Sequence, residues 1–340
     1  MAPILAHGVA PTSMSGYSAR PDSLDHEAYG FEHMPYRRST YGDNRASTDE
    51  NPHQASFEGG SETATTRAEE KVTMTEARGP AGPGGAAHAR YAPGTPCWVS
   101  LMVHGLTATQ DFYRELFGWE FQPGPEQLGP YVRALLDGRE VAGIGQLPPD
   151  RHLPVAWTPY LASDDVDSTA ETVRLCGGTI GVGPLDAADA GRLAIGSDPA
   201  GAVFGVWQAA AHLGTDVTGV PGTPAWNELL TFETAGVTKF YETVFGYERE
   251  AVVSPDFDYV TLHLAGRPVA GIHGVGNALP RDRGPHWMTY FEVADTDAAL
   301  TLVTGLGGRV LAPAHDSAHG RVATVADPEG ARFALIQGPR

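Results

Sequence analysis

Three side chains, one carboxylate and two imidazoles, are the residues of this chain whose types best suit chemistry: Glu228, His263 and His273. Carboxylate and imidazole groups bind divalent metal ions, and an imidazole beside a carboxylate can act as a general acid–base pair. No short spacing ties the three together, so each also has a structural explanation. Glu228 could face solvent or cap a hydrogen-bond network, His263 could be a half-exposed strand residue, and His273 could face solvent at a strand end. The sequence leaves a joint site and these separate roles open.

An internal duplication makes the three residues comparable with a second copy. Residues 112–120 (Phe-Tyr-Arg-Glu-Leu-Phe-Gly-Trp-Glu) return as residues 240–248 (Phe-Tyr-Glu-Thr-Val-Phe-Gly-Tyr-Glu), an offset of 128 (240 − 112). The tetrapeptide Val-Ala-Gly-Ile recurs at the same offset, at 141–144 and 269–272. Two patterns with one spacing indicate a repeated structural unit.

Alignment of the two copies shows where they differ. The second half has its carboxylate and imidazoles where the first half has Ser100, Leu135 and Gly145, whereas Arg133 becomes Thr261. Tyr131 recurs as Tyr259, which favours a shared structural role for this pair. The second half has therefore diverged towards acid–base or metal-binding residue types.

Each copy divides further into two modules of one strand, one helix and further strands. In the first, residues 98–103 alternate as a strand, residues 108–116 form an amphipathic helix that Gly118 ends, and residues 131–136 and 140–144 form a hairpin. Residues 157–162 and 166–176 begin a second strand–helix unit, and Trp226 and Trp287 open the third and fourth. Gly-Gly and Asp-Pro-x-Gly, at 177–178 and 198–201, recur at 307–308 and 327–330. The sequence therefore predicts four modules in two pairs.

The N-terminal segment differs from the rest. Residues 1–94 are rich in Ser, Thr, Gly, Pro, Glu and Arg without a sustained period, which predicts a disordered low-complexity tail. Met74 has the form of an internal start, and the sequence does not decide whether residues 1–73 belong to the native protein. We expect paired-module domains at 95–210 and 224–338, joined by a linker at 211–223.

Composition limits the partners. A formal charge of −18 and a pI near 5.0 argue against nucleic acid and anionic membranes, which need a basic surface. No apolar run is long enough for a membrane span. The two cysteines occupy non-equivalent places in the repeat, so neither a disulfide framework nor a cysteine metal site is indicated. We expect a cytoplasmic protein, a monomer or a homodimer, with a small molecule as its partner.

The paired modules, with Phe-Tyr-x-x-x-Phe-Gly closing a helix and Asp-Pro-x-Gly in the last hairpin, resemble the vicinal oxygen chelate superfamily, over about residues 95–338. Its members include glyoxalases, extradiol dioxygenases, fosfomycin-resistance enzymes and bleomycin-binding proteins. The combination looks most like the tandem, four-module, glyoxalase-like branch. The resemblance implies an α+β fold of four βαβββ modules, paired into two open, eight-stranded, barrel-like domains. The fold carries several chemistries, so the family alone does not give the reaction.

Enzymes of this superfamily hold a divalent ion with His, Glu or Gln from the first and last strands of each module. The resemblance places those ligand positions on residues that supply no carboxylate or imidazole: Trp98, Thr158, Gly205, Trp226, Met288 and Ala334. We therefore expect no cofactor at the standard positions, although a divalent metal held by Glu228, His263 and His273 is a possible alternative. A second pair of histidines, His315 and His319, has Pro313 and Gly320 beside it and is expected in a loop, not in a helical metal clamp.

Aromatic side chains stand at or near the expected ligand positions. We expect this set to line a cavity: Trp98, Trp157, Tyr160, Trp226, Tyr259, Trp287 and Tyr290. Alternation places Trp157 and Tyr160 on opposite faces of a strand, so the set divides between a cavity and a core. We expect a binding or resistance protein for a small, partly aromatic molecule, such as a secondary metabolite. The alternative is an enzyme of lyase, isomerase or oxygenase type that uses acid–base or metal-assisted chemistry in the C-terminal half.

Overall fold

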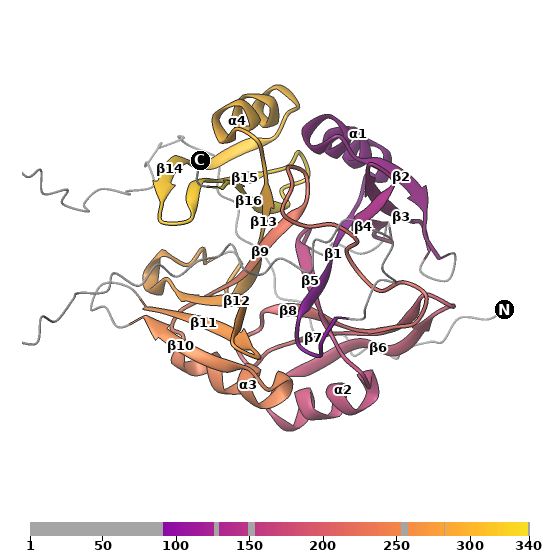
Figure 1. The fold of residues 1–340 in the computed structure, drawn as a ribbon, viewed down its shortest axis with the longest axis vertical. Coiled ribbons are helices and arrows are strands. Elements are labelled where there is room, and N and C mark those ends of the chain that lie inside the picture. Colours follow the sequence, from indigo (N-terminus) through magenta and orange to yellow (C-terminus); the bar gives the residue numbers. More distant parts are fainter. Residues whose placement is uncertain (1–90, 126–128, 149–153, 253–257, 282, 339–340) are drawn as a thin grey trace, which may run out of the picture. The chain divides into compact units, whose positions relative to one another are not determined.

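The computed structural model describes residues 91–338 except 126–128, 149–153, 253–257 and 282 (Figure 1). The predicted tail lies outside the described residues as far as residue 90, as does the possible start at Met74. Residues 91–94 already contact the folded region, since the Tyr91 hydroxyl donates to the backbone oxygen of Thr215 over 2.6 Å.

Each half contains eight strands and two helices in the predicted order. The first half consists of β1 (Pro96–Val103), α1 (Leu106–Phe117), β2 (Glu120–Pro123), β3 (Tyr131–Leu136), β4 (Arg139–Gln146), β5 (Trp157–Ala162), α2 (Val166–Leu175), β6 (Thr179–Ala187), β7 (Gly191–Ser197) and β8 (Val203–Ala209). The second half consists of β9 (Pro224–Thr231), α3 (Ala235–Phe245), β10 (Glu248–Val252), β11 (Asp258–Leu264), β12 (Arg267–Gly274), the short 3-10 helix η3 (Gly276–Ala278), β13 (His286–Glu292), α4 (Thr296–Gly305), β14 (Arg309–Ser317), β15 (Gly320–Ala326) and β16 (Arg332–Gln337).

The strands form two open sheets with the same topology. Their orders are β2-β3-β4-β1-β5-β8-β7-β6 and β10-β11-β12-β9-β13-β16-β15-β14. The first strands of paired modules meet antiparallel at the centre of each sheet, β1 with β5 and β9 with β13. The predicted α+β fold of four βαβββ modules in two barrel-like sheets is therefore confirmed.

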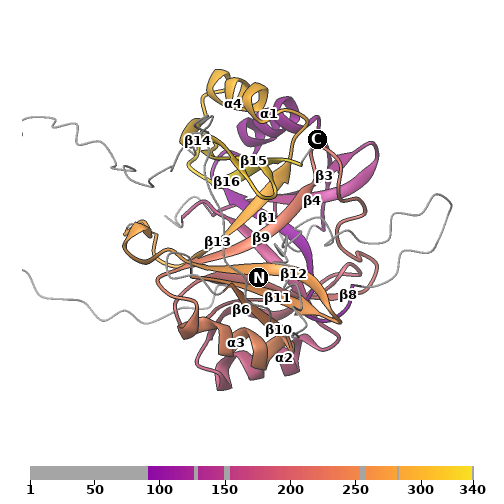
Figure 2. The ribbon, with the colours of Figure 1, turned by 60° about the vertical axis from the view of Figure 1, so that its left-hand side comes forward.

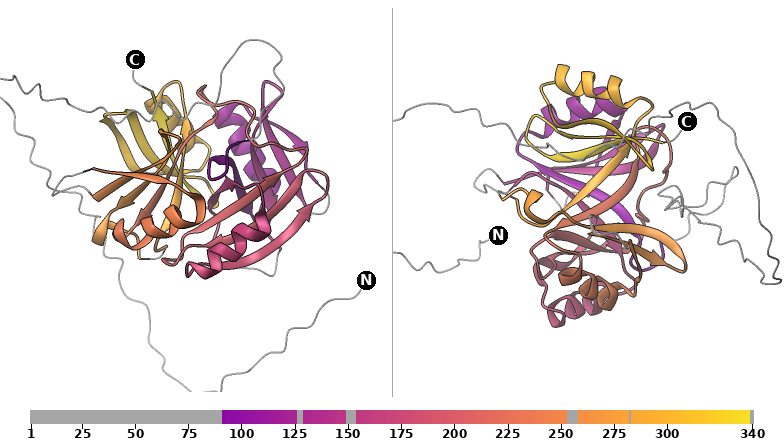
Figure 3. Two further views of the ribbon diagram at one scale, coloured as in Figure 1. Left: turned by 60° about the horizontal axis from the view of Figure 1, so that its bottom comes forward. Right: turned by 90° about the vertical axis from the view of Figure 1, so that its left-hand side faces the viewer.

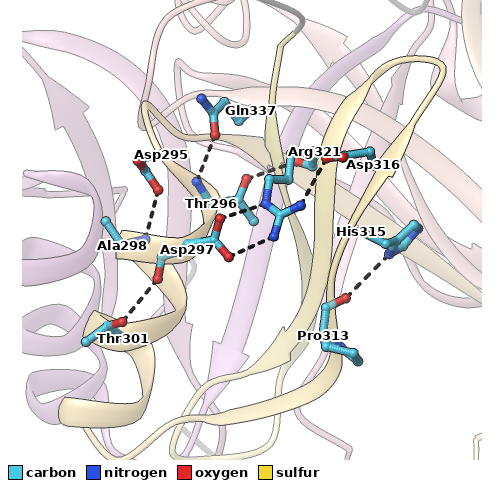
Figure 4. Close-up of polar contacts among 10 residues, drawn as sticks. All are labelled: Asp295, Thr296, Asp297, Ala298, Thr301, Pro313, His315, Asp316, Arg321 and Gln337. Atoms are coloured by element: carbon cyan, nitrogen blue, oxygen red, sulfur yellow. Dashed lines mark hydrogen bonds and ion pairs between the residues drawn. The ribbon is translucent and has the colours of Figure 1, made fainter.

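Local sequence explains where the elements end. Gly118 and Gly246 follow α1 and α3 with φ of 73° each, and their N–H groups donate to the preceding helical turn. The side chain of Asp295 caps α4 by accepting from the N–H of Ala298, as Figure 4 shows. Asp137 and Gly138 both have positive φ, which suits the tight hairpin turn that the sequence predicts between β3 and β4.

The helices pack across the two halves. Helix α1 lies beside α4, and α2 lies beside α3, in both Figure 1 and Figure 2. One apolar core accordingly combines the first and fourth modules, with Phe117 against Phe291, and a second combines the second and third modules, with Phe204 against Phe245. Figure 3 shows the same pairing from two further directions. Each sheet therefore places one face on a core shared with the other half.

The repeated Phe-Tyr and Asp-Pro motifs meet in these cores. The buried Tyr113 hydroxyl donates to Asp327 over 3.1 Å and accepts from the Trp157 indole over 3.0 Å. In the second core, Tyr241 forms the equivalent bonds with Asp198 and Trp287, over 3.0 and 3.1 Å. Trp157 and Trp287, predicted as possible cavity residues, thus lie in the cores on the helix-covered faces.

The repeat extends to the segments that enter β1 and β9. The Trp119 indole donates to the backbone oxygen of Gly222, and the Tyr247 hydroxyl donates to that of Gly94. Both acceptors precede a central strand, and their separation is again 128 residues (222 − 94). None of the described helices is long and apolar enough to cross a membrane.

Candidate functional site

Glu228 is the centre of a polar cluster on the second sheet. The cluster lies on the concave face, which is the face opposite the helix-covered core. Glu228 lies on β9, where Leu229 points into the shared core, so alternation turns Glu228 to the opposite face. Its side chain is almost buried, with the whole residue 5% exposed. One carboxylate oxygen accepts from the Tyr290 hydroxyl over 2.5 Å, and the other lies 2.9 Å from Nδ1 of His273. An ionised carboxylate only accepts, so the hydrogen of this second bond belongs to the imidazole.

The strand register brings these three residues together. Glu228 lies opposite Met288 of β13 and Gly271 of β12, so Tyr290 and His273 stand two residues further along their strands and reach Glu228 diagonally. Burial and the Glu228 carboxylate raise the pKa of Tyr290 well above its ordinary value. Tyr290 therefore stays protonated at neutral pH and remains a hydrogen-bond donor to Glu228.

His263 lies apart from the other two candidates. On β11, Tyr259 is the residue that pairs with His273. His263 stands four residues further along the same strand, a separation of about 13 Å. Its Nε2 lies 3.4 Å from a carboxylate oxygen of Glu250 on β10. The structure thus brings Glu228 and His273 together and leaves His263 beside a different carboxylate.

Tyr259 and Trp226 form the aromatic part of the same face. The Tyr259 ring lies 5.6 Å from the His273 ring at 62°, and Gly271 makes room for it, because a Cβ there would stand 2.0 Å from the Tyr259 hydroxyl oxygen. Burial and the charge of Glu228 raise the pKa of Tyr259, while the Trp226 indole opposes that rise. Three of the predicted aromatic residues, with Tyr290 included, therefore surround Glu228.

On the equivalent face of the first sheet, side chains of the chain itself contact one another and the backbone. The Trp98 indole donates to the Tyr131 hydroxyl over 3.1 Å, and Ser100 lies 3.2 Å from the same oxygen. Tyr160 packs against Gly205, where a Cβ would stand 2.2 Å from its ring. On this face Trp98 thus bonds to Tyr131, and Tyr160 packs against the backbone of β8.

The linker completes the first face. The His212 ring packs edge-on against Trp98 at 4.4 Å and against Trp207 at 5.6 Å, and its Nδ1 lies 2.7 Å from Glu140. Arg133 forms an ion pair with the same carboxylate. Side chains of the chain itself thus occupy this part of the first face.

The described residues do not match the donor set of a protein-held divalent ion. Among them, no group of three His, Cys, Asp or Glu side chains gathers in a geometry that could hold a metal. Glu228 and His273 provide two donors, and they bond to each other, whereas Met288 lies opposite Glu228. A stable site generally needs at least three protein ligands. We therefore derive no chemical step through a metal.

His319 is a residue that the sequence did not assign to the site. It lies in the turn between β14 and β15, where burial lowers the pKa of its imidazole and the charge of Glu228 opposes that change. His315 belongs to β14, not to a loop as expected, and its Nδ1 lies 3.4 Å from the backbone oxygen of Pro313 (Figure 4). A predicted hairpin of β14 and β15 would have placed His319 at its turn. Register shifts in this pairing interrupt the alternation by which a hairpin is predicted from the sequence.

A cavity of about 570 Å³ adjoins this face, where the N-terminal ends of β1 and β9 meet the linker. Trp98, Trp226 and His319 are among its lining residues. Its volume lies within the range of small-molecule pockets.

Comparisons with known proteins agree with this architecture. A family model described as "Glyoxalase-like domain" matches residues 231–336. The Mycobacterium tuberculosis protein "Putative glyoxylase CFP32" is 36% identical over 258 residues, which cover 73% of this chain and 96% of that protein. The Streptomyces peucetius "Anthracycline biosynthesis protein DnrV" is 34% identical over 267 residues, 73% of this chain and 94% of the relative.

Solved structures share the fold at low sequence identity. The 2,3-dioxygenase LapB from Pseudomonas sp. KL28 has a TM-score of 0.52 at 16% identity, covering 74% of this chain and 94% of its own. The Mn(II)-bound glyoxalase from Novosphingobium aromaticivorans has a TM-score of 0.52 at 17% identity, covering 73% and 83%. Together with the module topology and the identity to full-length relatives, these matches show that the chain belongs to the glyoxalase-like branch of the vicinal oxygen chelate superfamily.

Proposed function

We propose that the second half binds a small, partly aromatic organic molecule on the concave face of its sheet, with Glu228 as the polar centre. The observation that carries this proposal is the nearly buried Glu228 carboxylate, hydrogen-bonded to His273 and Tyr290. Burial of a carboxylate is unfavourable even when it is hydrogen-bonded. The first half builds the same sheet with Ser100 at this position, so the fold does not require the charge. A ligand that uses the carboxylate accounts for it.

The surroundings support an aromatic ligand. Trp226, Tyr259 and Tyr290 surround Glu228 on the concave face, and aromatic side chains favour stacked or edge-on contacts with planar rings. Two Streptomyces relatives are named for anthracycline biosynthesis, which supports a polycyclic aromatic molecule of secondary metabolism. The same names favour a role in the handling of such a compound.

A proton-transfer enzyme is the second candidate. The hydrogen bond between Glu228 and His273 favours it, because a carboxylate joined to an imidazole can take a proton from one atom of a bound molecule and return it to another. Tyr290 would donate a hydrogen bond to the carboxylate throughout. Such a reaction is of isomerase or lyase type, and it requires only the side chains described.

Titration of the full-length protein with 1,8-dihydroxyanthraquinone, followed by tryptophan quenching and calorimetry, tests the binding proposal. We expect Glu228→Gln to weaken binding about 10- to 100-fold, the value of one hydrogen bond to a charged group. Ser100→Ala, at the equivalent position of the first half, should leave affinity unchanged. Equal affinity of wild type and Glu228→Gln, or no response to this compound and to related anthraquinones, would overturn the proposal.

Two additions to the titration separate the remaining alternatives. Affinity should survive treatment with EDTA, and a loss that Mn²⁺ restores would overturn a metal-free site. For the enzyme candidate, an aromatic ketone with hydrogens on the carbon beside its carbonyl, such as 1-tetralone, is incubated with the protein in D₂O, recovered and weighed by mass spectrometry. Deuterium at a carbon position in the presence of wild type, but not of His273→Ala, supports proton transfer, and equal incorporation with both proteins contradicts it.

A further inference from the structure

Two buried polar side chains, Trp226 and Thr261, stand beside Gly271 on the concave face of the second sheet. Gly271 pairs with Glu228 of β9 on one side and with Thr261 of β11 on the other. The neighbours of Thr261 on β11 point into the core, so alternation turns its hydroxyl to the concave face. The Trp226 indole nitrogen and the Thr261 hydroxyl are buried, and neither forms a hydrogen bond in the part of the chain that the structure describes. Because buried polar groups are normally hydrogen-bonded, this pair indicates a place for a ligand.

The space above Gly271 already holds a phenol, that of Tyr259. A Cβ on Gly271 would stand 2.0 Å from the Tyr259 hydroxyl oxygen and 3.3 Å from the Trp226 indole nitrogen, so both polar groups converge there. We call this space, bounded by Gly271, Trp226, Glu228 and Thr261, the Gly271 site. The fold thus places an aromatic hydroxyl in the Gly271 site.

The first half shows a phenol with well-formed hydrogen bonds in the equivalent position. A Cβ on Gly143 would stand 1.7 Å from the Tyr131 hydroxyl oxygen. That oxygen accepts from the Trp98 indole over 3.1 Å and lies 3.2 Å from the Ser100 hydroxyl oxygen. The Trp98 N–H therefore has a partner where the N–H of its counterpart in the second half has none among the described residues.

Tyr259 fits the Gly271 site less well than Tyr131 fits its own. The Trp226 indole opposes the rise that burial causes in the pKa of Tyr259, but it lacks the hydrogen-bond geometry that Trp98 has with Tyr131. The hydroxyl of Thr261 is a further polar group that Tyr259 leaves unsatisfied. A phenol placed differently in this site would gain both contacts.

We propose that the Gly271 site binds the hydroxyl of a phenolic ligand, and that the Tyr259 side chain leaves the site when the ligand enters. A hydroxyl can donate to Glu228 while it accepts from Trp226 and Thr261. Each Glu228 oxygen takes part in one hydrogen bond of the cluster and keeps a second lone pair for this contact. The proposal rests on the proposed function, and it adds the chemical class of the ligand and the side chain that the ligand displaces.

Two naphthalenes and a conservative variant test the proposal by calorimetry on the full-length protein. We expect 2-naphthol to bind at least about 10-fold more tightly than 2-methoxynaphthalene, in which a methyl group replaces the donated hydrogen. Tyr259→Phe should bind 2-naphthol about 3- to 10-fold more tightly than wild type, because a displaced phenylalanine gives up no hydrogen bond. Tyr131→Phe, the matched control in the first half, should leave this affinity unchanged.

A second variant separates a ligand contact from a structural one. Thr261→Val replaces the buried hydroxyl by a methyl group of similar size. Because this hydroxyl forms no hydrogen bond among the described residues, the thermal unfolding temperature should stay equal or rise, while the affinity for 2-naphthol falls about 3- to 10-fold. Thr289→Val is the matched control, since Thr289 is equally buried but donates to Asn227 over 2.8 Å. It should lower the unfolding temperature and leave the affinity unchanged.

The outcomes separate this inference from the function on which it rests. Three results each overturn the Gly271 site: equal affinity for the two naphthalenes, no binding of 2-naphthol, or an affinity in Tyr259→Phe that is unchanged or weaker. A loss of 1,8-dihydroxyanthraquinone affinity in Glu228→Gln would still support the proposed function. A lower unfolding temperature with unchanged affinity in Thr261→Val would show a structural hydroxyl and overturn its role. The expected naphthol results with no effect of Glu228→Gln would support the site and overturn the role of Glu228.

Discussion

The two concave faces of this duplicated protein use one scaffold in opposite ways. In the first half, Ser100 and Gly145 carry no charge, and His212 of the linker packs between Trp98 and Trp207. In the second half, the positions of Ser100 and Gly145 hold Glu228 and His273, which bind each other. One face is thus packed largely by side chains of the chain itself, whereas the other holds an ionisable cluster beside a cavity.

The largest effect is expected from the glycines that accommodate the repeated tyrosines. A Cβ at Gly143 would stand 1.7 Å from the Tyr131 hydroxyl oxygen, and one at Gly271 would stand 2.0 Å from that of Tyr259. Gly143→Ala and Gly271→Ala should each lower the free energy of unfolding by about 2–4 kcal/mol. Only Gly271→Ala should also weaken binding of 1,8-dihydroxyanthraquinone, because Tyr259 lies beside His273. Urea unfolding and the anthraquinone titration measure both effects, and a binding defect in Gly143→Ala alone would contradict the division between the faces.

Two carboxylate–imidazole pairs provide a more selective comparison. Glu228–His273 at 2.9 Å serves the second face, and Glu140–His212 at 2.7 Å serves the first. A double-mutant cycle of Glu228→Gln with His273→Ala should show a coupling of about 1–2 kcal/mol in the binding of 1,8-dihydroxyanthraquinone. The cycle of Glu140→Gln with His212→Ala should show coupling in the free energy of unfolding and none in binding. Coupling of the first pair to binding would place a ligand on the linker-packed face.

The sequence predicted the scaffold better than the site. The 128-residue repeat and the Phe-Tyr and Asp-Pro motifs were sufficient for four modules, and Tyr113 and Asp327 show why, since these motifs bond to each other in a core. Periodicity describes a single strand, however, and it does not give the register between strands. It therefore could not separate His263 from His273 or place Tyr290 on Glu228. The packing of the helices across the halves was also beyond reach, because the same apolar faces would suit partners within one half.

The two core tyrosines test whether the shared cores are equivalent. Tyr113→Phe removes a donor from Asp327 and an acceptor from Trp157, and Tyr241→Phe does the same to Asp198 and Trp287. Each should lower the free energy of unfolding by about 1–2 kcal/mol, and the two should add, because the cores are separate. Neither variant should change the affinity for 1,8-dihydroxyanthraquinone. A large difference between the two variants, in urea unfolding, would show that one core contributes more than the other.

The smallest expected effect is on the pH dependence of stability, where the carboxylates of the buried Asp198 and the half-buried Glu140 act with opposite sign. Burial raises the pKa of Asp198 above its ordinary value, although the N–H of Ala202 and the Tyr241 hydroxyl oppose this. Burial would also raise the pKa of Glu140, but His212 and Arg133 lower it below its ordinary value. The contribution of Asp198 to stability is therefore full below its unfolded pKa and is lost as pH rises through its folded pKa. That of Glu140 is present above its unfolded pKa and is lost as pH falls through its folded pKa.

Urea unfolding between pH 3 and 7 measures this difference in sign. Asp198→Asn should flatten the part of the profile in which the free energy of unfolding falls with rising pH. Glu140→Gln should flatten the part in which it rises. Because His212 and Arg133 both lower the pKa of Glu140, His212→Ala should reproduce part of the change seen in Glu140→Gln and leave the Asp198 part unchanged. If the free energy of unfolding still rises with pH to the same extent in His212→Ala, Arg133 alone lowers the pKa of Glu140. The linker would then pack against the first face without contributing to its electrostatics.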